Sequence, residues 1–109
     1  MTVIVLDPGA QTVFVRAELD QIMQLYGRMV AAGQWRDYAL HFEPSRAVFS
    51  AFRRATDRPE YRLVKEPALK ARQGQYRLLG EQGQTLRRGD DLPSVLAPAA
   101  RRLLKIVTA

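Results

Sequence analysis

The sequence predicts an α+β domain: an antiparallel meander of about five strands, a long N-terminal amphipathic helix packed on one sheet face, and a C-terminal helix. Apolar residues recur with helical spacing before Gly33 and again after Asp91. Between these segments they alternate with the period of two that strands require. The breaks between the alternating runs are too short for parallel crossovers, which need about a dozen residues or more, and this favours antiparallel pairing.

The N-terminal residues carry two short runs rich in β-branched side chains, at 2–6 and 11–15. Pro8 and Gly9 lie between the runs, and these residue types supply the fixed and the positive φ angles that tight turns use. The sequence therefore allows an optional N-terminal β-hairpin ahead of the first helix.

The clearest helical periodicity runs from about Arg16 to Ala32. Its apolar stripe consists of Leu19, Ile22, Met23, Tyr26, Met29 and Val30. Glu18 and Asp20 near the start and Arg28 near the end complement the helix dipole, and Gly33 suits the left-handed position that commonly follows a helix. These features predict an amphipathic helix whose apolar face covers the sheet.

Five alternating segments follow Gly33. The predicted strands are 36–42, 47–53, 60–65, 75–79 and 84–88. Asp90 and Asp91 precede a second helical stripe that begins at Leu92, and either acid can cap this C-terminal helix. Pro98 is expected to kink the helix or to split it. We expect the core to include Leu19, Ile22, Met23, Tyr26, Val30, Phe49, Phe52, Tyr61, Leu63, Tyr76, Leu78 and Leu96.

Length and composition indicate one globular domain over residues 1–109. The chain is 47% apolar and 26% charged, which is typical of a folded protein rather than a disordered one. It has no cysteine, so disulfides and zinc sites of the cysteine type are excluded. No run is long enough to span a membrane, and the first residues lack the basic segment of a secretory signal. We expect a cytoplasmic protein.

Charge is divided unequally along the chain. Residues 1–43 carry three arginines against five acids, a balance of −2, whereas residues 44–109 carry fourteen cations against six acids, a balance of +8. Clustered cations favour anionic partners such as nucleic acid, acidic protein surfaces or lipid headgroups. GC-rich coding also raises the ratio of arginine to lysine, but it explains the segregation less well.

An aromatic residue followed by arginine recurs in the predicted strands, at 52–53, 61–62 and 76–77. Neighbouring residues of a strand point to opposite faces. We therefore expect the aromatics on the helix-covered face and a row of Arg53, Arg62 and Arg77, joined by Arg87, on the other. The candidate polyanion-binding residues are Arg53, Arg54, Arg62, Lys70, Arg72, Arg77, Arg87 and Arg88. The alternative is a solvated sheet face whose arginine stems cover Ala51, Val64 and Leu79.

Catalytic interpretations have less support. Asp37, His41 and Glu43 share one strand parity, so they could hold a metal or place an acid beside an imidazole. The chain has a single histidine, however, and a surface or structural role is the simpler interpretation. Asp90 and Asp91 could ligate Mg²⁺, but helix capping explains them better. We therefore predict no catalytic residue, no metal site and no cofactor.

Several segments together resemble a known family. They are 25–33 and 35–39, with further matches at Phe49, 52–54, Pro59, Tyr61, 72–74, Tyr76 and 89–92. In these segments the chain resembles a family of small alphaproteobacterial proteins designated a domain of unknown function (DUF2794). The likeness covers roughly residues 14–96, with 1–13 and 97–109 as variable extensions. It implies a bacterial cytoplasmic setting and brings no activity, cofactor or catalytic residue.

Three functional hypotheses follow. The first is a small non-enzymatic binding module whose arginine face contacts a polyanion, chiefly RNA or DNA backbone without strong sequence readout. The second is an adaptor or homodimer that docks on an acidic protein, with arginines at the rim of the interface and an apolar centre. A metal-assisted hydrolase built on Asp37, His41 and Glu43 is a third. The arginine face requires that the C-terminal helix leave the second sheet face open.

Overall fold

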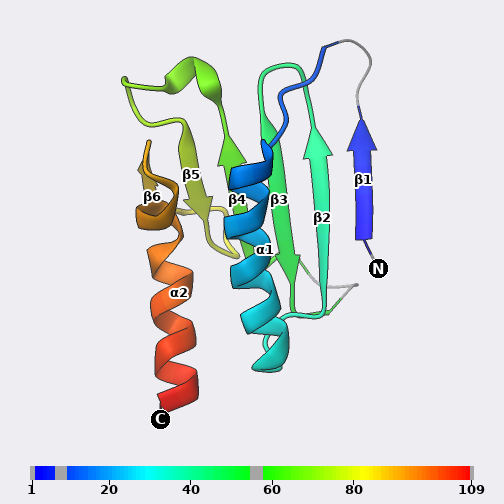
Figure 1. The fold of residues 1–109 in the computed structure, drawn as a ribbon, viewed down its shortest axis with the longest axis vertical. Helices are drawn as coiled ribbons and strands as arrows, with labels where there is room; N and C mark the ends of the chain where they lie inside the picture. The colour runs from blue at the N-terminus through cyan, green and yellow to red at the C-terminus, as the bar shows by residue number, and fades with distance from the viewer. Residues whose placement is uncertain (1, 7–9, 55–57, 109) are drawn as a thin grey trace.

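The computed structural model describes residues 2–6, 10–54 and 58–108, which form one sheet of six strands with two helices on one face (Figure 1). In chain order the elements are β1 (Thr2–Leu6), α1 (Arg16–Ala31), β2 (Asp37–Phe42), β3 (Ala47–Phe52), β4 (Tyr61–Lys65), the 3-10 turn η1 (Pro67–Leu69), β5 (Tyr76–Leu79), β6 (Thr85–Gly89) and α2 (Leu92–Thr108). The strand order in the sheet equals the chain order. The predicted α+β class and the antiparallel meander of β2 to β6 are confirmed.

The N-terminal hairpin is wrong. Residues 2–6 form β1, but this strand pairs in parallel with β2, and residues 11–15 form no strand. Thr12 instead bonds the turn between β2 and β3, through its amide to the Glu43 carbonyl (2.8 Å) and its hydroxyl to the Pro44 carbonyl (2.7 Å). Phe14 is buried in the core. The 16-residue helix α1 provides the long crossover that a parallel pair needs.

Helix α1 begins and ends as its sequence predicts. The Val15 amide donates to the Glu18 carboxylate (2.7 Å) at the N-terminus, and Gly33 adopts a φ of +74° just after the C-terminus. Ile22 and Met29 of the predicted stripe are buried, but the stripe lies slightly to one side of the predicted one, because Leu25 is also buried whereas Val30 is 43% exposed.

Helix α2 continues through Pro98 as one helix, so it is not split. Its N-terminus is capped by Asp91, whose carboxylate accepts the Ser94 amide at 3.1 Å. Its buried stripe packs against β5, β6 and α1. Both helices therefore cover the same sheet face, and among the described residues no helix lies over the other face (Figure 1). We call that other face the open face.

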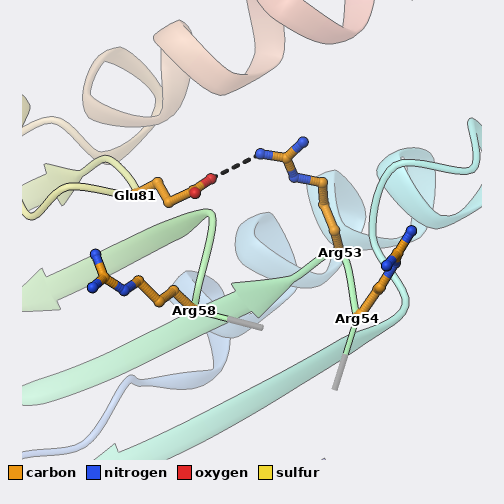
Figure 2. A pocket seen from close by; sticks show the side chains of 4 residues that line it. All are labelled: Arg53, Arg54, Arg58 and Glu81. Atoms are coloured by element: carbon orange, nitrogen blue, oxygen red, sulfur yellow. Dashed lines mark hydrogen bonds and ion pairs between the residues drawn. The ribbon is translucent and has the colours of Figure 1, made fainter. Parts of the chain in front are cut away.

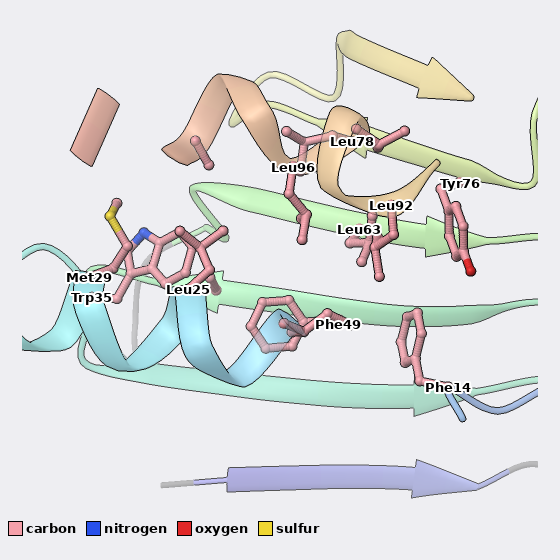
Figure 3. Close-up of a cluster of buried hydrophobic side chains, with 14 of the residues drawn as sticks. Phe14, Leu25, Met29, Trp35, Phe49, Leu63, Tyr76, Leu78, Leu92 and Leu96 are labelled. Atoms are coloured by element: carbon pink, nitrogen blue, oxygen red, sulfur yellow. The ribbon is translucent and has the colours of Figure 1, made fainter. Parts of the chain in front are cut away.

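The core lies between the helices and the sheet, as Figure 3 shows. Six residues of the predicted core are buried: Ile22, Phe49, Leu63, Tyr76, Leu78 and Leu96. Four others are partly buried against them: Leu19, Met23, Tyr26 and Tyr61. Phe52 is wrongly included, because it lies three residues after Phe49 in β3 and so points to the open face. Trp35 is 2% exposed and is the largest buried side chain that the prediction omitted.

Candidate anion-binding site

The open face carries three of the predicted arginines. The strand register places Ser50, Arg62 and Leu79 in one row across the sheet, and Val48, Val64, Arg77 and Arg88 in the next row. Val64 is only 3% exposed although no helix of the described chain covers it. This burial agrees with the alternative prediction, in which arginine stems lie over apolar neighbours on this face.

Two of these three arginines already have partners. Arg77 donates to the Glu66 carboxylate at 3.0 Å, and Arg88 donates to the Gln73 side chain at 2.7 Å. The open face is therefore a mixed surface of apolar residues and arginines, in which Arg77 is paired with an acid and Arg88 with an uncharged amide.

The predicted row is wrong for Arg53 and Arg87. Phe52 is paired with Asp37 on the open face, so Arg53, the next residue, turns toward the helix side just beyond the end of β3. Arg87 is paired with Leu78 on the helix face and donates to the Ser94 carbonyl at 3.3 Å. The pairing between β5 and β6 shifts in register between Leu78 and Leu79. Side chains of β6 therefore do not alternate regularly between the two faces along the whole strand. Ala51 also faces the helices, so open-face stems do not cover it.

Lys70 and Arg72 lie in the loop between η1 and β5, at the opposite end of the sheet from Arg53 (Figure 1). This loop is held by Asp90, whose carboxylate accepts the amides of Ala71 (2.9 Å) and Gln75 (2.7 Å). Those two bonds lower the pKa of Asp90. A Cβ on Gly74 would lie 2.5 Å from the Gly89 Cα, so the loop and the end of β6 are in direct contact. Asp90 thus fixes a loop, and Asp91 caps α2.

A basic hollow lies beyond the C-terminal end of β3, the end of this strand that lies lowest in Figure 1. Arg53, Arg54, Arg58 and Glu81 line a space of about 390 Å³ (Figure 2). Arg62 lines an adjoining space of about 280 Å³ together with Arg58 and Glu81. We call these four arginines and the hollows between them the arginine groove. It joins Arg53, Arg54 and Arg62 of the predicted set, and it adds Arg58, which the sequence analysis missed.

The sequence contains only a weak indication that Arg58 belongs to the site. Arg58 is four residues after Arg54 and adjoins Pro59 in a predicted break between strands. Strands β3 and β4 are antiparallel, so the residues that flank this break lie at one end of the sheet, but no periodic pattern in the sequence predicts that Arg54 and Arg58 line one hollow.

A buried carboxylate fixes Arg53. Glu60 is 6% exposed. Its Oε2 forms an ion pair with the Arg53 Nε at 2.6 Å, and its Oε1 accepts hydrogen bonds from the Trp35 indole N–H at 3.0 Å and the Arg102 guanidinium at 2.5 Å. Burial acts to lower the pKa of Arg102, but the hydrogen bonds to Glu60 and Tyr61 outweigh it and leave that pKa raised. A buried acid with three donors is a stable anchor, so Arg53 has a defined position.

The remaining arginines of the groove are not neutralised in this way. Arg53 has a second partner, because its outer amino group donates to the Glu81 carboxylate at 2.8 Å. In the described part of the chain, no acid forms an ion pair with Arg54, Arg58 or Arg62. Among the described residues that line it, the groove therefore concentrates positive charge around one exposed acid, Glu81, and such a site attracts anions.

The predicted metal or acid-base residues are not brought together as a group. His41 Nε2 lies 2.9 Å from Glu43 Oε2, and Arg46 contacts the same carboxylate at 3.1 Å. Asp37 is four residues before His41 on β2, about 13 Å along the strand. No cluster of three histidine or acidic side chains suited to a metal ion occurs among the described residues.

The fold and the groove define the class of the molecule: a small α+β protein with a basic hollow at one end of its sheet. The chain belongs to the family described as "Protein of unknown function (DUF2794)", whose model matches residues 12–96. The matched region includes every residue of the arginine groove. No curated protein and no solved structure matches the chain. Within the described residues, no helix is both long and apolar enough to cross a membrane.

Proposed function

We propose that this protein is a small non-enzymatic binding module of the bacterial cytoplasm whose arginine groove contacts a polyanion, chiefly nucleic-acid backbone. The observation that carries the proposal is the surplus of charge in the groove. Three arginines without an acid partner among the described residues surround a fourth that a buried glutamate fixes. Clustered arginines that lack acid partners are the electrostatic signature of a phosphate-binding surface.

The directions of the side chains favour an extended ligand. In Figure 2 the guanidinium groups of Arg53, Arg54 and Arg58 point to different sides of the hollow rather than toward one point. Such an arrangement suits successive phosphates of a strand better than a single small anion. Contacts to phosphates position a nucleic acid without reading its bases, so we expect little sequence preference.

The open face extends this surface. Arg62 belongs both to the groove and to the open face, where Arg77 and Arg88 lie in the neighbouring row. A strand bound in the groove could therefore continue across the sheet toward these two residues. Arg87, on the helix face, and Lys70 and Arg72, at the far end of the sheet, lie outside this path.

The experiment compares two double variants that remove equal charge. We expect R54Q/R58Q to weaken binding of a fluorescent single-stranded RNA and a DNA duplex at low salt. It should also reduce the slope of log affinity against log salt by about 2. K70Q/R72Q, at the other end of the molecule, is the matched control and should have a smaller effect. Equal losses would show that only net charge matters. Failure of the unmodified protein to bind either ligand at low ionic strength would exclude the function.

A second candidate is an adaptor or homodimer that docks on an acidic protein. The composition of the open face favours it, because the partly buried apolar residues Val48, Phe52 and Leu79 are interspersed there with Arg62, Arg77 and Arg88. Affinity capture from lysate, with and without nuclease, separates the two functions. Acidic partners retained after nuclease treatment would favour the adaptor, and light scattering of the purified protein would test the homodimer.

A further inference from the structure

We propose that Glu81 is a built-in competitor for the ligand of the arginine groove, and that a backbone phosphate replaces its carboxylate as the outer partner of Arg53. The inference rests on the proposed function and adds a regulatory acid to the same site. It assigns different roles to the two carboxylates that contact Arg53: Glu60 holds the arginine in place, and Glu81 occupies its binding edge.

The position of Glu81 is the first reason. It lies in the turn between β5 and β6, which is closed by the Gly80 amide to the Gln84 carbonyl (2.9 Å) and the Gly83 amide to the Gly80 carbonyl (3.0 Å). Its side chain lines both hollows of the arginine groove and a third hollow of about 460 Å³ that is also bordered by Arg53, Tyr61 and Arg102. A strand that follows these hollows must therefore pass the Glu81 carboxylate.

The unequal burial of the two partners is the second reason. The Glu60 side chain is 7% exposed and the Glu81 side chain 42% exposed. Glu60 is also held by Trp35 and Arg102 and is closed to solvent, whereas the exposed ion pair between Arg53 and Glu81 contributes little and exchanges readily. A ligand would therefore displace Glu81 and leave Glu60 in place.

The geometry of arginine makes this exchange local. Arg53 uses its Nε for Glu60 and an amino group for Glu81, so the two bonds lie on different parts of one rigid fork. Release of Glu81 exposes the amino group without moving the guanidinium. A phosphate oxygen is a strong acceptor for that group and can take the position that the carboxylate leaves.

The test is the affinity of E81Q for the same single-stranded RNA at low salt. We expect it to bind about three- to fivefold more tightly than the unmodified protein. The matched control is E43Q, which also removes one acid that pairs with an arginine (Arg46, 3.1 Å) but lies at the opposite end of the sheet. E43Q should change the affinity less than twofold. Thermal melting of each variant establishes that it is folded at the assay temperature.

A double-mutant cycle with Arg53 separates competition from a general charge effect. If Glu81 acts by occupying Arg53, the gain from E81Q should disappear in an R53Q background. A gain that persists without Arg53, or a gain no larger than that of E43Q, would overturn the inference while RNA binding by the unmodified protein still supports the proposed function. Absence of RNA binding by both the unmodified protein and E81Q would overturn the proposed function itself.

Discussion

Two buried glutamates lie at opposite ends of the sheet, and the protein neutralises them differently. Glu18, in the first turn of α1, accepts hydrogen bonds from Lys65 (2.8 Å), from the Val15 amide (2.7 Å) and from the Tyr76 hydroxyl. All three partners lie within the protein at that end. Glu60, at the start of β4, is instead bonded by two arginines that both reach outward.

The difference follows from the shape of the cations. The Lys65 ammonium is a compact charge that bonds both Glu18 and the Val13 carbonyl (3.0 Å), and its side chain is only 10% exposed. Arginine is a planar fork with donors on several edges, so Arg53 can satisfy a buried acid and still present an amino group to a ligand. The end of the sheet that contains Glu18 is therefore a closed structural site. At the end that contains Glu60, Arg53 also has an amino group that can contact a ligand. Three variants test this contrast, in order of expected effect.

The largest effect is expected from K65M. This variant leaves the Glu18 carboxylate buried without its cation, and we expect a loss of about 3 kcal/mol or more in the free energy of unfolding, measured by urea denaturation. The double variant E18Q/K65M removes both charges and should recover most of that loss. A K65M protein as stable as the unmodified one would show that the Glu18 end is not a structural site.

The second effect concerns acid stability. Burial acts to raise the pKa of Glu18, but the bonds from Lys65, Tyr76 and Val15 outweigh it and lower the value below the ordinary 4.5. The folded-state pKa is thus depressed, so the stabilisation is present above the unfolded value and is lost as the pH falls through the folded value. We expect melting temperature to fall more steeply below about pH 4.5 for the unmodified protein than for E18Q. If the melting temperatures of the unmodified protein and E18Q fall equally with pH, Glu18 does not contribute to acid stability in this way.

Besides burial, the hydrogen bond between Glu18 and Tyr76 shifts the pKa of the tyrosine in the opposite direction, upward. Burial and its hydrogen bond to Glu18 raise the pKa of the Tyr76 hydroxyl. The tyrosine therefore remains a neutral donor to Glu18 throughout the physiological pH range.

The smallest effect on stability is expected from R53Q. The side chain is 54% exposed, and Glu60 keeps its bonds from Trp35 and Arg102, so we expect a loss below about 1 kcal/mol by urea denaturation. The same variant should weaken RNA binding measurably. A severe loss of stability would place Arg53 with Lys65 among the structural cations and would remove the contrast between the two ends.

The sequence predicted the elements better than it predicted the site. Tyr61-Arg62 and Tyr76-Arg77 alternate as expected because they lie within regular strands. The prediction failed for Phe52-Arg53 although β3 alternates regularly, because Phe49 and Phe52 have opposite parity and cannot both face the helices. It also failed for Arg87, beside the register shift. Alternation therefore assigns faces only where the inward residue is identified correctly and the strand is regularly paired.

Other features depend on contacts between distant segments. Glu60 and Arg102 are 42 residues apart, and Glu18 and Lys65 are 47 residues apart, so no local pattern connects either pair. The signal available for the second pair was Lys65 itself, a charged residue with the parity of the core residue Leu63. The parallel pairing of β1 was missed because the Pro-Gly sequence at residues 8–9, which lies outside the described residues, suggested a local reversal.

The order of the strands in the sheet has a consequence for how the chain folds. Every antiparallel pair from β2 to β6 joins strands that are consecutive in the sequence. Strand β1, in contrast, can pair with β2 only after α1 has formed the crossover between them. Folding rates rise as contacts become more local, so we expect the meander to assemble hairpin by hairpin and β1 to dock last. The family match begins at residue 12, after this late-docking strand.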